Sequence, residues 1–211
     1  MFFMTQSPQG KLEVICGSMF SGKTEELVYR LRRAEYAKKK VVTIKHKIDN
    51  RKSYSCIVSH NGTQREAYPV TSCEEGLSRL REVASDHTVD VVGMDEIQFF
   101  PIETIPIIQQ LIDDGTRVIV AGLDLDYRGE PFGIVPHLMA LADSVTKLNA
   151  ICMSCGEEAM HTQRLIDGNP ASYHGETILV GGDECYEARC RQCYSIDYKS
   201  YVCEKEECTV S

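Results

Sequence analysis

The sequence predicts an α/β fold, a parallel P-loop sheet with helices on both faces, followed by a small cysteine-rich unit. Three observations support this prediction. Short β-branched segments alternate with amphipathic segments over residues 11–151. A glycine-rich segment, residues 17–24, joins the first predicted strand to the first predicted helix. Two Cys-x-x-Cys pairs then follow the alternating region.

The predicted elements alternate regularly along the first part of the chain. The predicted strands are 11–16, 41–45, 89–95, 117–123 and 145–151. The predicted helices are 24–37, 72–84, 105–114 and 134–142, the second opened by a Ser-x-x-Glu capping box. Residues 52–71 are polar and turn-rich, and we expect one hairpin there, around Asn61-Gly62.

The glycine-rich segment matches the phosphate-binding pattern G-x-x-x-x-G-K-[ST] at every fixed position. We call it the phosphate loop, and its residues are Gly17, Ser18, Met19, Phe20, Ser21, Gly22, Lys23 and Thr24. Glycines allow successive backbone N–H groups to face one centre, and the following helix adds the positive end of its dipole. We expect Lys23 to reach the β and γ phosphates and the Thr24 hydroxyl to ligate Mg²⁺. The alternative is a glycine turn before an ordinary helix.

Acidic residues follow the third predicted strand, which is apolar and ends in Asp95-Glu96. Downstream of a phosphate loop, such an ending resembles a Walker B element, with Asp95 at Mg²⁺ and Glu96 able to accept a proton from a nucleophile. Asp49 and Arg51 follow the second strand at the same sheet edge. We expect them near the metal and phosphates, unless they form an exposed loop salt bridge.

The two cysteine pairs, Cys152/Cys155 and Cys190/Cys193, have the spacing of a closed four-thiolate zinc site. We expect a structural Zn²⁺, because all four positions are filled by protein. A redox role is disfavoured, since neither pair opens a helix after a strand. The metal would pin both ends of residues 156–189, a candidate lid over a small acceptor.

Composition narrows the function classes further. The chain has 211 residues, 31 acidic and 23 basic, with a net charge of −8, which disfavours broad nucleic-acid binding. Residues 1–10 lack the features of a signal peptide, and no apolar run is long enough for a membrane span. We therefore expect a cytoplasmic protein. The expected organisation is a tail (1–10), a nucleotide-binding domain (11–151), a zinc-binding domain (152–194) and a second tail (195–211).

Taken together, these motifs resemble the cytosolic, zinc-containing (type II) thymidine kinases over about residues 10–194. The resemblance rests on the phosphate loop, Asp49-Asn-Arg51, Asp95-Glu-Ile-Gln-Phe-Phe100, Pro131-Phe-Gly133, the cysteine pairs, and Gly181-Gly182 with Tyr186. It implies transfer of the ATP γ-phosphoryl group to the 5′-hydroxyl of thymidine or deoxyuridine, in nucleotide salvage for DNA synthesis. It also implies ATP, Mg²⁺ and Zn²⁺ as cofactors, a zinc ribbon with a lasso-like loop, feedback inhibition by dTTP and a homotetramer.

The resemblance also implies roles for individual residues. Glu96 would be the catalytic base, and Gln98 would join the phosphate loop, Asp49, Arg51 and Asp95 in binding the nucleotide and its metal. The residues implied to surround the nucleoside are Met19, Phe99, Tyr127, Phe132, Thr162, Thr177, Ile178, Leu179, Val180, Gly181 and Tyr186. Tyr127 stands where relatives often carry Phe.

Two other functions fit parts of the sequence. An ATPase or nucleic-acid remodelling module would share the phosphate loop and use Glu96 to activate water, but the acidic surface argues against it. A zinc-ribbon interaction protein with a degenerate nucleotide site is disfavoured, because every reactive position is filled.

Overall fold

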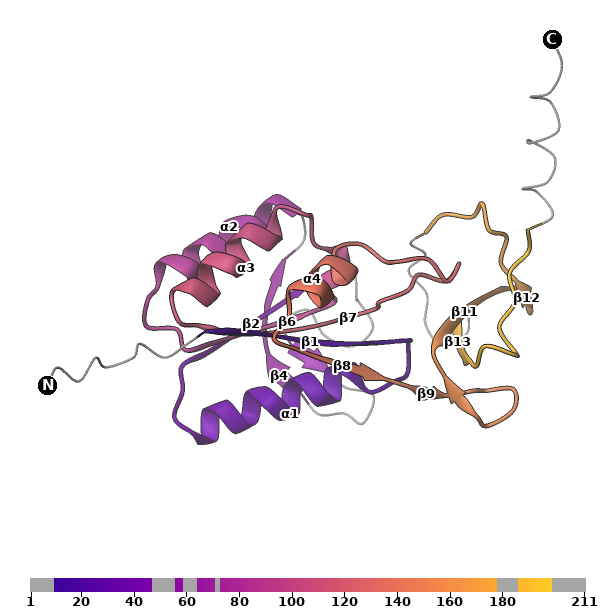
Figure 1. Ribbon diagram of the computed structural model, residues 1–211, viewed down its shortest axis with the longest axis horizontal. Helices are drawn as coiled ribbons and strands as arrows, with labels where there is room; N and C mark the ends of the chain where they lie inside the picture. The colour runs from indigo at the N-terminus through magenta and orange to yellow at the C-terminus, as the bar shows by residue number, and fades with distance from the viewer. Residues whose placement is uncertain (1–9, 47–55, 59–63, 71–72, 178–185, 199–211) are drawn as a thin grey trace, which may run out of the picture.

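The computed structural model describes residues 10–46, 56–58, 64–70, 73–177 and 186–198, and its centre is a six-stranded parallel sheet (Figure 1). The strand order is β5-β2-β6-β7-β1-β8. The bounds are β1 Lys11–Gly17, β2 Val41–His46, β5 Tyr68–Val70, β6 Val91–Asp95, β7 Arg117–Gly122 and β8 Ser144–Leu148. All five neighbouring pairs are parallel, which confirms the predicted sheet.

Helices cover both faces of this sheet, as predicted. Figure 1 shows α1 (Lys23–Tyr36) below the sheet, and α2 (Cys73–Ser85), α3 (Thr104–Asp113) and α4 (Val135–Leu141) above it. On the α1 side, Leu27 and Leu31 pack against Ile15 and Ile119 with no exposed surface. A larger apolar core lies on the other side, beneath α2, α3 and α4. Burial of these faces supplies most of the driving force for folding.

The described residues between 56 and 70 form three short strands. The predicted hairpin forms as β3 (Cys56–Val58) paired with β4 (Gln64–Glu66), while its Asn61-Gly62 turn lies outside the described residues. Strand β5 was not predicted. It pairs with β2 at the sheet edge, where Pro69 is tolerated because only one side of the strand needs hydrogen-bond donors.

The predicted strand 145–151 divides into two. Its first part is β8, the other edge of the main sheet, and its end is β9 (Ala150–Ile151), which pairs with β10 (Glu158–Ala159). Strand β11 (His161–Ile166) then pairs with both β12 (Asn169–Pro170) and β13 (Tyr186–Arg189). These short strands form a second unit at the carboxyl end of the main sheet (Figure 1).

The predicted domain limits stay predictions, but the start of the expected second tail contacts the second unit. Ser195 N donates to Gln163 Oε1 at 2.9 Å, and Tyr173 N donates to Asp197 O at 3.0 Å. Among the described helices, none has the length and apolar character needed to cross a bilayer.

Candidate active site

The phosphate loop connects the carboxyl end of β1 to the start of α1, the arrangement its pattern requires. Gly17 has φ +142°, and a Cβ there would lie 2.1 Å from the Leu148 carbonyl oxygen, so only glycine fits. Gly22 adopts a left-handed conformation, φ +83°, and caps α1. Lys23 and Thr24 are therefore the first two residues of the helix, where its dipole favours anions.

Lys23 folds back across its own loop. Its Nζ donates to the Ser18 carbonyl at 2.6 Å, and Ser21 Oγ donates to the same oxygen at 2.8 Å. A single carbonyl oxygen thus accepts hydrogen bonds from both side chains. It is an acceptor that a phosphate oxygen could replace.

Thr24 and Asp95 meet as the sequence predicts, although 71 residues separate them. Thr24 Oγ1 donates to Asp95 Oδ2 at 3.2 Å. Asp95 ends β6 and is only 3% exposed, and burial raises the pKa of its carboxyl. The charge of Glu96 raises that pKa further, while Lys45 and Lys23 oppose the shift. A buried carboxylate beside a hydroxyl is an oxygen donor set that fits Mg²⁺.

Glu96 directly follows Asp95 in a strained conformation. Its backbone is left-handed, φ 55° and ψ 41°, which is uncommon outside glycine and recurs at functional sites. Gln98 Nε2 donates to Glu96 Oε2 at 2.6 Å, and Gln98 Oε1 accepts from Leu123 N at 3.1 Å. The amide is thus fixed at one end by the backbone after β7 and orients the Glu96 carboxylate with the other.

Aromatic side chains flank this acidic pair. The rings of Phe99 and Phe132 meet edge to face at 5.7 Å, and His46 lies 5.7 Å from Phe99. Burial lowers the pKa of His46, which favours the neutral ring. Gly133 lets the chain next to Phe132 lie close to the Gln98 carbonyl oxygen, because a Cβ at this position would lie only 2.2 Å from that oxygen.

The second unit is fastened to the phosphate loop by hydrogen bonds. Met19 N donates to Thr162 Oγ1 at 3.0 Å, and Ser18 Oγ donates to the Ala159 carbonyl at 3.3 Å. Thr162 is buried in β11. Its hydroxyl accepts one bond and keeps its own proton available to donate.

A second aromatic cluster lies where the two units meet. Tyr127 and Tyr186 pack together with Ala171, and Met19 and Phe20 pack against them. Three residues that the family resemblance implies around the nucleoside, Met19, Tyr127 and Tyr186, therefore lie in one cluster.

The Tyr127 hydroxyl has protein partners. It lies 2.9 Å from the Ser172 carbonyl and 3.0 Å from that of Gly175. Arg164 lies 4.2 Å above the Tyr127 ring and also donates to the Glu176 carbonyl. Both side chains thereby hold residues 172–176, in the middle of the candidate lid.

The four predicted cysteines converge. Their Sγ atoms all lie within 4.8 Å of one another, and those of Cys155 and Cys190 are 3.7 Å apart. A tetrahedral zinc with Zn–S bonds of about 2.3 Å implies sulfur separations of about 3.8 Å. The Cys193 backbone N–H lowers the pKa of Cys190, which favours the thiolate. The cluster could therefore bind a structural zinc.

Comparison with known families agrees with this geometry. The family model described as thymidine kinase matches residues 10–194. The chain belongs to the thymidine kinase family. Membership implies a nucleoside kinase, a phosphotransferase acting on a small molecule.

A solved structure of another protein is similar to part of the chain. It is the crystal structure of a DNA replication initiation factor, 15% identical, matched over 66% of this chain with a TM-score of 0.42. The chain spans only 40% of that protein's length.

Some residues implied by the family lie outside the described residues. These are Asp49 and Arg51 after β2, and Ile178, Leu179, Val180 and Gly181 in the candidate lid. Thr177 is the last described residue before that gap.

The structure gives two side chains, those of Gln98 and Arg164, contacts that the sequence did not predict. Gln98 was placed among the nucleotide ligands, and its side chain instead contacts Glu96; a nucleotide contact stays a prediction. Arg164 was not among the predicted site residues. It is 3% exposed, and a buried arginine beside a predicted substrate tyrosine has no periodic signal that could identify it.

Proposed function

We propose that this member of the thymidine kinase family transfers the γ-phosphoryl group of ATP to the 5′-hydroxyl of thymidine, and also of deoxyuridine. The observation that carries the proposal is the chain of contacts Thr24–Asp95–Glu96–Gln98 at the carboxyl edge of the sheet. It brings the predicted Mg²⁺ ligands Thr24 and Asp95, and a carboxylate held by an amide, to the end of the phosphate loop. Family membership supports the same reaction class.

The phosphate loop would bind the triphosphate. Lys23 would exchange the Ser18 carbonyl for phosphate oxygens, and the backbone around Gly22 would donate to them. Thr24 and Asp95 would hold Mg²⁺, which neutralises phosphate charge when bound.

Glu96 would act as the base. Its carboxylate would accept the proton of the attacking 5′-hydroxyl, and Gln98 would keep the acceptor oxygen in place. Because phosphoryl transfer depends mostly on positioning and charge, a fixed carboxylate contributes by orientation as well as by basicity.

The acceptor would lie between the two aromatic clusters. Phe99 and Phe132 would line one side, and Met19, Tyr127 and Tyr186 the other. Thr162 and the loop from Thr177 to Gly181 would donate and accept hydrogen bonds to the base.

The family resemblance extends this proposal to inhibition by dTTP, a homotetramer and a cytoplasmic location. Light scattering of purified protein would test the tetramer, and a dTTP titration of the initial rate would test the inhibition.

A nucleoside panel with ATP and Mg²⁺ tests the reaction itself. We expect thymidine and deoxyuridine to yield 5′-monophosphates, and we expect little ADP release without nucleoside. Glu96→Gln should lower kcat by about 10²–10⁴ while ATP still binds. ADP release at the full rate without nucleoside would favour the ATPase alternative, and near-normal kcat in Glu96→Gln would refute the base assignment.

A further inference from the structure

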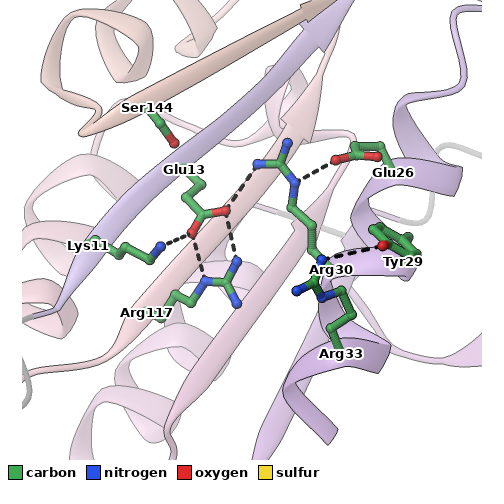
Figure 2. Close-up of a pocket in the computed structure, with 8 residues that line it drawn as sticks. All are labelled: Lys11, Glu13, Glu26, Tyr29, Arg30, Arg33, Arg117 and Ser144. Carbon is green, nitrogen blue, oxygen red and sulfur yellow. Dashed lines mark hydrogen bonds and ion pairs between the residues drawn. The ribbon is translucent and has the colours of Figure 1, made fainter. Parts of the chain in front are cut away.

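A pocket of about 450 Å³ lies between α1 and the amino ends of β1, β7 and β8 (Figure 2). Its lining includes Lys11, Arg117 and Ser144, which are the first residues of β1, β7 and β8. The phosphate loop, in contrast, follows the carboxyl end of β1. The pocket volume falls within the range of small-molecule sites, roughly 300–1,000 Å³.

The pocket carries an excess of positive charge. Four cationic side chains, Lys11, Arg30, Arg33 and Arg117, face two carboxylates, those of Glu13 and Glu26. Two positive charges therefore remain uncompensated in a chain whose net charge is −8. A local field of opposite sign to the whole protein marks a site for an anion rather than a general charge pattern.

Glu13 forms ion pairs with three of these four cations. Its carboxylate accepts from Arg117 at 2.7 and 2.9 Å and from Arg30 at 3.0 Å, and Lys11 lies 2.6 Å away (Figure 2). Arg30 also bonds Glu26 at 2.8 Å. These contacts fix three cations at the pocket wall in one arrangement.

Arg33 is not part of that network. It donates to the hydroxyl of Tyr29 at 3.3 Å, and its guanidinium carbon lies 5.7 Å from the Tyr29 ring centre. Tyr29 is 55% exposed, so its ring offers a flat apolar surface at the pocket rim. The arginine therefore keeps donors for a ligand, and guanidinium donors match phosphate oxygens better than an ammonium does.

We propose that this pocket binds a phosphate group, distinct from the one held by the phosphate loop. A phosphomonoester carries about −1.5 to −2 charge at neutral pH, which matches the two excess positive charges. Arg33, Lys11 and Arg117 contact its oxygens, and the Ser144 hydroxyl lies in the same lining. The phosphate is either free or the phosphate of a nucleotide whose base lies on Tyr29.

The site can be located by titrating inorganic phosphate into the full-length protein at constant ionic strength and following backbone amide NMR signals. We expect saturable shifts at Lys11, Arg33 and Ser144. Arg33→Gln should raise the dissociation constant about tenfold, the loss expected for one charge-assisted phosphate contact. Arg32→Gln removes the same charge from an exposed neighbouring position of α1 outside this lining, and it should change the constant less than twofold.

A second variant, Lys23→Ala, distinguishes phosphate binding at this pocket from phosphate binding at the phosphate loop. In Lys23→Ala, the shifts at Lys11, Arg33 and Ser144 should persist with unchanged affinity. Shifts that vanish in Lys23→Ala, that never saturate, or that weaken equally in Arg33→Gln and Arg32→Gln would overturn the proposal.

Repeating the titration with AMP distinguishes the two sources of the phosphate. Tighter binding of AMP than of inorganic phosphate, abolished by Tyr29→Leu, identifies a nucleotide. Equal affinities identify the phosphate group alone. Both results support the site, and the proposed kinase reaction does not enter either measurement.

Discussion

Replacement of Glu13 by Gln should destabilise the fold by about 3 kcal/mol at neutral pH. Glu13 is 4% exposed and contacts Lys11, Arg30 and Arg117. Burial alone would raise the pKa of its carboxyl, but the cations, Arg117 first, outweigh burial and lower that pKa from 4.5 to about 2. At roughly 1.36 kcal/mol per pH unit, this difference gives the figure of about 3 kcal/mol.

The contribution of Glu13 to the free energy of unfolding depends on pH in a direction that the pKa shift fixes. Because the folded pKa lies below the unfolded one, the contribution of Glu13 is fully present above about pH 4.5 and is lost as pH falls towards 2. Urea denaturation of wild type and Glu13→Gln between pH 3 and 7 should therefore show a stability gap that narrows below pH 4.5. Glu82→Gln, an exposed pair with Arg79, should cost only a few tenths of a kcal/mol. A gap below 1 kcal/mol at pH 7, or one independent of pH, would refute the reasoning.

Three further predictions concern the site. Gln98→Leu removes the amide that orients Glu96, so kcat should fall about tenfold or more while KM for ATP stays within twofold; an unchanged kcat contradicts the positioning role. Gly17→Ala forces a Cβ into a backbone carbonyl and should abolish ATP binding in calorimetry, whereas Gly168→Ala, also at positive φ but in open space, should retain it. Cys155→Ser should lower both the zinc content and Tm, and wild type should contain about one zinc per chain by elemental analysis.

The central sheet could be predicted because its strands carry a strong local signal. Strands β6 and β7 are continuous apolar runs, as expected for strands buried on both faces. Strand β5 could not be found in this way, since it has three residues, one of them Pro69, and exists only because β2 offers an unpaired edge. The break between β8 and β9 was missed for a related reason. A change of partner sheet leaves no mark in hydrophobic periodicity.

The arrangement of the candidate site could be predicted for residues that belong to a motif of fixed spacing. Gly22, Lys23, Thr24 and Asp95 belong to a motif with fixed spacing, and the structure brings Thr24 to Asp95. Gln98 shows the limit of that reasoning. Its position in the motif was recognised, but its contact with Glu96 depends on a backbone N–H after β7, which sequence order alone does not place.

The phosphate loop serves two purposes at once. In a loop that only binds phosphate, successive backbone N–H groups point toward one anion. Here Met19 N is taken by Thr162, and Met19 and Phe20 pack against Tyr127 and Tyr186. The first half of the loop is therefore shaped by the second unit, and we propose that the second half, ending in Thr24, binds phosphate and metal.

The hydrogen bond between Met19 and Thr162 also connects the phosphate loop to the cysteine cluster. Strands β11 and β13 pair between the two cysteine pairs, so a zinc ion bound there would fix the strand that holds Thr162. Because Thr162 in turn fixes Met19, we infer that loss of the metal alters the loop before it alters the distant sheet. A zinc ion bound by the four cysteines would thus influence the phosphate loop through the hydrogen bond between Thr162 and Met19.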